Sequence, residues 1–192
     1  LRKARRLAQT KRRIKLPSLD PTQIAVVTFS DASFGNMPGY ASPAGDISVL
    51  SHEAVTQAKA PFALMEWHSN KVRRVVKSTL ASEAGALSMA QDRNEFIRVI
   101  VAYMFGLMDV RRDRDWTQAL EAVPGHLVID ARSLYDLLNK DGSLPAEKRI
   151  ALDMVAVREG LSRPRDHLHW IATRWMLANT LTKDVRDCAA LQ

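Results

Sequence analysis

The spacing of apolar residues changes near residue 79, from a strand pattern to a helix pattern. Residues 24–29, 45–50 and 62–67 are β-branched or alternate between apolar and polar side chains, and polar turns bound them, which predicts three antiparallel strands. From residue 79 to about residue 105 no proline intervenes, and apolar side chains recur at helical spacing. We predict one long helix there, with a broad apolar face made of Leu80, Leu87, Phe96, Ile100 and Met104.

Shorter elements follow in the second half of the chain. The pattern predicts a buried strand over residues 126–130, helices over 131–139 and 147–161, a final strand over 168–171 and a terminal helix over 176–187. Strands therefore come first and then alternate with helices. This order indicates an α/β domain.

Composition narrows the class of protein. With 192 residues, of which 46% are hydrophobic, the chain can form one domain with its own core. The longest apolar run, residues 99–108, is about half as long as a membrane helix requires, so we expect no membrane-spanning segment. The single cysteine, Cys188, has no partner for an internal disulfide, which favours an intracellular setting. Because the sequence begins with Leu1, we expect it to be part of a longer chain.

The net charge of +7 is concentrated at the N-terminus. Residues 1–15 hold many Lys and Arg and no acidic residue, so the rest of the chain is close to neutral. Two prolines in residues 16–22 predict an extended linker. We therefore divide the chain into a basic arm with its linker, residues 1–23, and a domain, residues 24–192. Such an arm suits nucleic-acid phosphates, with Arg2, Arg5 and Arg12 among the contacts. A solvated helix face and an organelle transit segment stay open as alternatives.

Acidic side chains stand where elements of the predicted sheet and helix meet. Asp31 and Asp130 each follow an apolar strand directly, and Glu83 comes early in the long helix. Side chains converge at the carboxyl ends of strands in α/β sheets, and carboxylate oxygens are ligands that Mg²⁺ prefers. Two such ions about 4 Å apart can promote phosphodiester cleavage. The alternative is that these acids are ordinary turn or cap residues.

Six short sequence blocks contain or surround these acids. They are 30–33 (Ser-Asp-Ala-Ser), 67–71 (Trp-His-Ser-Asn-Lys), 78–83 (Ser-Thr-Leu-Ala-Ser-Glu), 129–130 (Ile-Asp), 147–149 (Glu-Lys-Arg) and 176–183 (Met-Leu-Ala-Asn-Thr-Leu-Thr-Lys). Taken in this order, over roughly residues 24–184, they resemble the ribonuclease H domains of copia-type retrotransposon polyproteins. The resemblance implies a ribonuclease H-like fold, with a five-stranded mixed sheet flanked by helices. It also implies four acids that hold two Mg²⁺ ions against the RNA strand of an RNA–DNA hybrid.

The resemblance also implies a role for each acid. Asp31 would bridge both ions, Glu83 and Asp130 would hold one of them, and position 179 would serve the other. The family has Asp at that position, whereas this chain has Asn179, which keeps a carbonyl oxygen and loses a charge. We expect one of the two metal ions to be weakly held and turnover to be reduced. An active domain would bind two Mg²⁺ ions, and a domain that has lost its activity would bind one or none. Natural drift and deliberate substitution both explain Asn179.

Polar and basic residues near these acids are candidates for contact with the hybrid. They are Ser30, Ser33, Asn36, Lys71, Arg73, Arg74, Ser78, Thr79, Ser82 and Arg132. For Ser78 and Thr79, helix capping is an equal alternative to nucleic-acid contact. For the basic residues within 71–77, the alternative is an ordinary solvated loop. We predict that Trp67 belongs to the core and that His169 has a structural role beside Trp170. No histidine is assigned to catalysis.

Two functions of different classes fit the sequence. The first is a Mg²⁺-dependent nuclease acting on RNA–DNA hybrids, cytoplasmic or nuclear, with a reverse transcriptase domain as one expected partner. The second is a domesticated, non-catalytic subunit that binds structural RNA in a large ribonucleoprotein such as a mitochondrial ribosome. The missing fourth acid and the basic arm favour the second, and the three remaining acids favour the first. An integrase-like transposase would need glutamate at position 179, which is Asn.

Overall fold

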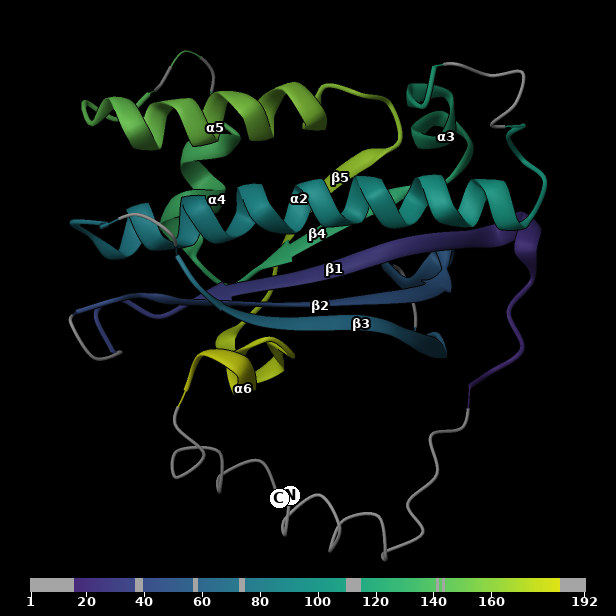
Figure 1. Ribbon diagram of the computed structural model, residues 1–192, viewed down its shortest axis with the longest axis horizontal. Coiled ribbons are helices and arrows are strands. Elements are labelled where there is room, and N and C mark those ends of the chain that lie inside the picture. The colour runs from purple at the N-terminus through teal and green to yellow at the C-terminus, as the bar shows by residue number, and fades with distance from the viewer. Residues whose placement is uncertain are drawn as a thin grey trace, which may run out of the picture.

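The computed structural model describes residues 16–36, 40–56, 59–72, 75–109, 115–140, 142 and 144–183. Within these residues five strands form one sheet in the order β3-β2-β1-β4-β5 (Figure 1). β1 pairs antiparallel with β2 and β2 with β3, whereas β4 lies parallel to β1 and β5 parallel to β4. The strands are β1 (Ile24–Ala32), β2 (Pro43–His52), β3 (Phe62–Lys71), β4 (Gly125–Ile129) and β5 (Asp166–Trp170). The predicted α/β class with a five-stranded mixed sheet is confirmed.

Helices cover the two faces of the sheet unequally. Figure 1 shows α2, α3, α4 and α5 over one face and α6 on the opposite face. One part of the core joins Val26 of β1 to Val101 of α2, and another joins Leu87 of α2 to Ile129 of β4 and Met154 of α5. The helices are α2 (Thr79–Met104), α3 (Thr117–Ala122), α4 (Arg132–Leu138), α5 (Lys148–Leu161) and α6 (Asn179–Thr182), and the 3-10 segments are η1 (Pro21–Gln23), η2 (Glu53–Thr56) and η3 (Thr173–Trp175).

The long helix α2 is confirmed, and so is the burial of Leu87, but the rest of its predicted apolar face is wrong from Phe96 onward. Phe96 and Met104 are 64% and 67% exposed, and Ile100 is 36% exposed. Beyond Leu87 the buried line includes the polar Asn94, whose Nδ2 donates to Val26 O at 3.2 Å and to Thr28 Oγ1 at 3.0 Å. The second half of the helix thus packs hydrogen-bonded residues against the sheet, and apolar spacing alone selected the wrong side there.

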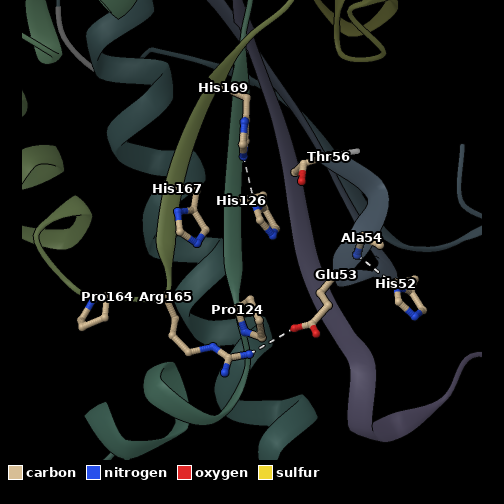
Figure 2. A pocket seen from close by; sticks show the side chains of 10 residues that line it. All are labelled: His52, Glu53, Ala54, Thr56, Pro124, His126, Pro164, Arg165, His167 and His169. Atoms are coloured by element: carbon tan, nitrogen blue, oxygen red, sulfur yellow. Dashed lines mark hydrogen bonds and ion pairs between the residues drawn. The ribbon is translucent and has the colours of Figure 1, made fainter. Parts of the chain in front are cut away.

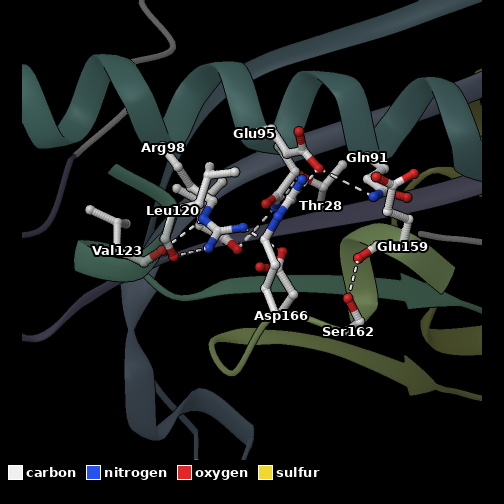
Figure 3. A network of polar contacts seen from close by, with 12 residues as sticks. Thr28, Gln91, Glu95, Arg98, Leu120, Val123, Glu159, Ser162 and Asp166 are labelled. Carbon is white, nitrogen blue, oxygen red and sulfur yellow. Dashed lines mark hydrogen bonds and ion pairs between the residues drawn. The ribbon is translucent and has the colours of Figure 1, made fainter. Parts of the chain in front are cut away.

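A buried arginine joins α2 to the segment that leads into β4. Arg98 is fully buried, and its Nε donates to Val123 O at 2.7 Å, its Nη2 to Leu120 O and its Nη1 to Asp166 Oδ1 (Figure 3). A Cβ at Gly125, the first residue of β4, would lie 2.5 Å from Arg98 Nη1. Only glycine leaves room for this network, which therefore sets the position of β4 beneath the helix.

The C-terminal region differs from the predicted helix over residues 176–187. Residues 173–175 form η3 and Met176 is extended, so the observed helix, α6, is four residues long. Residues 184–187 lie outside the described residues, as do Arg2, Arg5, Arg12, Arg73, Arg74 and Cys188. No helix within the described residues has both the length and the apolar character needed to cross a membrane.

Candidate active site

Three carboxylates from three elements meet at one edge of the sheet. Asp31 is near the end of β1, Asp130 directly follows β4, and Glu83 is in the second turn of α2. Since β1 and β4 are parallel neighbours, their carboxyl ends lie side by side, and α2 passes over them. One oxygen of each carboxylate lies within 4.8 Å of the others. The structure thus brings together three residues that the sequence singled out, and their catalytic role stays a prediction.

Burial makes this cluster electrostatically unfavourable when it is fully ionised. Asp31 and Glu83 are 5% and 7% exposed. Burial raises the pKa of Asp31 to about 6, and the Thr182 hydroxyl opposes this rise. Burial, followed by the negative charges of Asp31 and Asp130, raises the pKa of Glu83 to about 9. A cation bound among these oxygens would offset the repulsion and favour the ionised forms.

The donor set fits a hard divalent cation. Oxygen ligands on opposite sides of Mg²⁺ are about 4 Å apart, because each Mg–O bond is about 2.0–2.1 Å long. Carboxylate oxygens within 4.8 Å of one another are close to that spacing. Asp31, Glu83 and Asp130 are therefore the residues that would hold a divalent metal ion.

The short helix α6 lies against the same edge, with Asn179 as its first residue. Gly45 of β2, which is directly opposite Asp31 in the sheet, makes this packing possible. A Cβ at Gly45 would lie 2.7 Å from Leu181 Cβ and 3.0 Å from Thr182 Cγ2. The hydroxyl of Thr182 donates to Asp31 Oδ2. This bond ties the helix that carries Asn179, which is half-buried, to the first carboxylate.

Thr182 and Trp170 are site residues to which the sequence assigned no role. Trp170 Nε1 donates to the backbone oxygen of Asp130 at 2.9 Å, and the Arg132 guanidinium lies 5.0 Å from the centre of its ring. The only sequence signals for a role at the site were their positions: Thr182 is in the last matched sequence block, and Trp170 ends the last strand. Both side chains hold parts of the acidic cluster in place.

The proposed hybrid-contacting residues fall into two groups. Ser30 and Ser82 are 1% and 0% exposed, and Ser82 Oγ lies 3.2 Å from Ser42 Oγ. Their assignment to direct nucleic-acid contact is therefore wrong for this structure, because both side chains are buried. Ser78 caps α2, accepting a hydrogen bond from Ala81 N at 3.1 Å, which supports the capping alternative. The residues that are at least partly accessible are Ser33, Asn36, Lys71, Ser78, Thr79 and Arg132.

Two other predictions are settled by exposure and contacts. Trp67 is 61% exposed, so its assignment to the core is wrong. It is on β3, the outermost strand on that side of the sheet. His169 does not pair with Trp170, whose ring nitrogen is bonded to Asp130. Its Nε2 instead lies 2.9 Å from His126 Nδ1.

Comparison with known proteins identifies the fold. No protein-family model and no curated protein matches the chain. Among solved structures, the N-terminal ribonuclease H domain of a Mycobacterium tuberculosis protein is 16% identical with a TM-score of 0.51, covering 88% of this chain and 97% of its own. Ribonuclease H1 from Halobacterium salinarum is also 16% identical with a TM-score of 0.51, covering 86% of this chain and 99% of its own. A ribonuclease H1 isolated from compost is 14% identical, with a TM-score of 0.51 and coverage of 88% and 99%. The chain therefore has a ribonuclease H-like fold.

Proposed function

We propose that this chain is a metal-dependent nuclease domain of the ribonuclease H type, which cleaves the RNA strand of RNA–DNA hybrids. The observation that carries the proposal is the meeting of Asp31, Glu83 and Asp130 on a ribonuclease H-like fold, with oxygens within 4.8 Å of one another. Mg²⁺ held there would supply Lewis-acid stabilisation of the attacking and leaving oxygens of a phosphodiester. Asp31, Glu83 and Asp130 would position the cation, and the burial of Asp31 and Glu83 would shield two of its ligands from solvent.

The electrostatics of the cluster support a site for a cation rather than a structural ion pair. The side chains that shift the pKa of Glu83 are both acidic. By contrast, the buried Asp46 on β2 is paired with Arg93 of α2, which is how a fold usually stabilises a buried carboxylate. Asp31 and Glu83 instead have raised pKa values, and a bound positive charge would favour the ionised form of both near neutral pH.

Asn179 would weaken one of two metal positions. Its helix is fixed on Gly45 and bonded through Thr182 to Asp31, so position 179 belongs to the same edge of the sheet as the acids. An amide oxygen is a neutral ligand and attracts Mg²⁺ less strongly than a carboxylate does. We therefore propose reduced turnover at limiting Mg²⁺.

Accessible polar groups around the cluster would contact the hybrid. Arg132 follows Asp130 by two residues and is exposed, and Lys71 is exposed at the end of β3. Such side chains suit phosphates, and the accessible Ser33 and Asn36 suit phosphates and ribose hydroxyls. Arg73, Arg74 and the basic arm stay part of the proposal as further phosphate contacts.

The order of the six sequence blocks supports an origin in a copia-type retrotransposon polyprotein. Three of the blocks contain Asp31, Glu83 and Asp130, and the last contains α6 with Asn179 and Thr182. Residues that the resemblance marked separately thus lie around one site. We propose that a reverse transcriptase domain is the natural partner of this chain.

Cleavage of a labelled RNA strand tests the proposal. The wild-type chain, Asn179→Asp and Asp31→Asn are compared on RNA–DNA hybrid, double-stranded RNA and double-stranded DNA, in Mg²⁺ and then in Mn²⁺. Asn70→Asp, which makes the same charge change at an exposed position of β3, is the matched control. We expect Asn179→Asp to raise hybrid cleavage at limiting Mg²⁺ about tenfold or more, equivalent to about 1.4 kcal/mol of transition-state stabilisation.

The alternative function is a non-catalytic, RNA-binding subunit of a ribonucleoprotein. The observation that favours it is Asn179, a neutral residue where the resemblance implies a fourth acid. Under this alternative both the wild-type chain and Asn179→Asp leave the hybrid intact in either metal, while the chain still binds structured RNA. That outcome would overturn the proposed nuclease function.

A further inference from the structure

Two exposed tryptophans, each with an arginine over its ring, lie on the segment that joins β5 to α6. Trp170 is the last residue of β5, and Trp175 is the last residue of η3, which follows. The guanidinium carbon of Arg132 is 5.0 Å from the centre of the Trp170 ring, and that of Arg174 is 5.6 Å from the centre of the Trp175 ring. Trp170 and Trp175 are 39% and 66% exposed. Aromatic faces and cations are therefore side by side in these two arginine–tryptophan pairs.

The segment that carries the tryptophans is attached to the acidic cluster at both ends. At its beginning, Trp170 Nε1 donates to the backbone oxygen of Asp130 at 2.9 Å. At its end, the hydroxyl of Thr182 in α6 donates to Asp31 Oδ2. A chain of five residues spans at most about 18 Å when fully extended, so Trp175 is no further than that from Trp170. A nucleic-acid strand whose phosphate reached the acids would therefore pass close to both pairs.

Packing fixes the backbone on both sides of Trp175. Met176, the next residue, is 4% exposed and belongs to the core cluster of Val27 and Val128. On the other side, Trp175 N donates to Ala172 O at 2.8 Å. The ring of Trp175 is thus held in solvent by ordered neighbours, which is the arrangement that a stacking surface requires.

The arginines keep donors that can bind phosphate. Arg132 Nε donates to Asp136 Oδ2 at 3.1 Å, while its Nη1 and Nη2 have no hydrogen-bond acceptor among the described residues. Its guanidinium also lies 5.6 Å from the centre of the Tyr135 ring, which restricts its orientation. Arg174 is exposed and has no ion-pair partner in the described part of the chain. A guanidinium presents its N–H groups at its edge, where phosphate oxygens can accept two hydrogen bonds.

We propose that the two arginine–tryptophan pairs bind unpaired nucleotides that extend one strand of a hybrid beyond the duplex. The inference rests on the proposed function, since it takes a hybrid at the acidic cluster as the ligand. Bases inside a duplex stack on one another, whereas an unpaired base has a free face that can stack on a tryptophan ring or a guanidinium plane. The arginines neutralise the adjoining phosphates. The preferred substrate is therefore a hybrid with a single-stranded extension.

Other surfaces of the described part of the chain provide internal comparisons. Arg165 lines the pocket in Figure 2, but it is paired with Glu53 at 3.4 Å, and no tryptophan, tyrosine or phenylalanine is among the described residues of that lining. This pocket is at the beginning of β4, whereas Asp130 follows its end. Trp67 and Trp116 are 61% and 47% exposed, and neither has an arginine of the described residues over its ring. These two tryptophans are therefore matched controls for stacking.

Fluorescence anisotropy with labelled nucleic acids, in EDTA so that nothing is cleaved, tests the proposal. The probes are a blunt hybrid and the same hybrid with a short RNA extension, a short DNA extension or an abasic extension of equal length. We expect an extension that carries bases to tighten binding by the wild-type chain about tenfold or more. An abasic extension adds the same phosphates without the bases and gives a much smaller gain. A gain with RNA, with DNA or with both supports the proposal and identifies the strand that is bound.

Replacement of Trp175 separates stacking from a structural role. Trp175→Leu keeps an apolar side chain without a π face and loses most of the gain, whereas Trp175→Phe keeps most of it. Trp116→Leu, the control, keeps the wild-type gain. Because Trp175 is exposed, we expect the melting temperature of both Trp175 variants to stay at the wild-type value.

The proposal is overturned by equal affinity of the wild-type chain for blunt and extended hybrids, by an equal gain from the abasic extension, or by an undiminished gain in Trp175→Leu. These outcomes are independent of cleavage. A chain that binds the extension through Trp175 but leaves every hybrid intact in Mg²⁺ and Mn²⁺ contradicts the nuclease function and keeps this inference. A chain that cleaves the hybrid but gains nothing from an extension does the reverse.

Discussion

Glu83 is a carboxyl whose ionisation the metal-free fold opposes, so replacing it with glutamine alters how stability depends on pH. Its pKa rises from 4.5 to about 9, first through burial and then through Asp31 and Asp130. Below about pH 4.5 the group is protonated in both the folded and the unfolded chain, and its contribution to stability is fully present. As pH rises toward about 9, only the unfolded chain loses the proton, and the free energy of unfolding falls.

The magnitude follows from proton linkage. While one proton separates the two states, each pH unit lowers the free energy of unfolding by about 1.4 kcal/mol. A window from about pH 7 to about pH 8.5 lies above the pKa of Asp31, about 6, and above that of His126, about 4. Within that window Glu83 accounts for a loss of about 2 kcal/mol in the metal-free protein. The Glu83→Gln variant removes this loss, because glutamine is neutral at every pH in the window.

Urea unfolding in the presence of EDTA measures the effect at several pH values. Glu121→Gln, at an exposed position of α3, serves as the matched control and keeps the wild-type slope. Saturating Mg²⁺ flattens the wild-type slope, since the bound cation favours the ionised carboxylate. Equal pH slopes for the wild-type chain and Glu83→Gln, without metal, would refute the reasoning. In that case the carboxyl ionises in the folded state at an ordinary pH.

Two further variants test how the fold supports the site. Gly45→Ala places a methyl 2.7 Å from Leu181 Cβ, so we expect a stability loss of about 1–3 kcal/mol in urea unfolding and a loss of Mg²⁺ affinity in titration. Gly85→Ala is the control, because its methyl meets only an ordinary 3.8 Å contact, and it keeps the wild-type Mg²⁺ affinity. Arg98→Met leaves the carboxylate of Asp166 buried without its cation, and we expect a loss of about 3–5 kcal/mol in urea unfolding. Adding Asp166→Asn recovers part of that loss, and no recovery would contradict the ion pair as its cause.

Two burial predictions were wrong, and for the one on α2 the structure shows the physical origin. The pattern of apolar residues placed Phe96 on the buried face of α2 and Trp67 in the core, yet both are exposed. The helix instead buries Asn94 and Arg98, whose hydrogen bonds to the backbone and to Thr28 and Asp166 compensate for desolvation. Apolar spacing does not reveal such polar contacts, because their partners are distant in the sequence.

The acidic cluster was accessible to sequence reasoning for a different reason. Asp31 is near the end of β1 and Asp130 directly follows β4; these strands are parallel neighbours, and the carboxyl ends of such strands lie side by side in an α/β sheet. Glu83 was singled out by its place early in the long helix, and the ordered sequence blocks added position 179. The contact between Thr182 and Asp31 joins residues 151 positions apart, and nothing local in the chain indicates it.

The amino-acid sequence was enough to establish the strand and helix order, the α/β class and the three acids that come together, because periodicity and position at strand ends are local properties. Tertiary packing decided which face of α2 is buried, how α6 lies against Gly45, and which serines are covered. It also placed His126 beside His167, because β4 and β5 pair in parallel with Gly125 opposite Asp166, which is 41 positions further along the chain. Contacts of this kind depend on strand register and side-chain volume, which are fixed only when the whole chain folds.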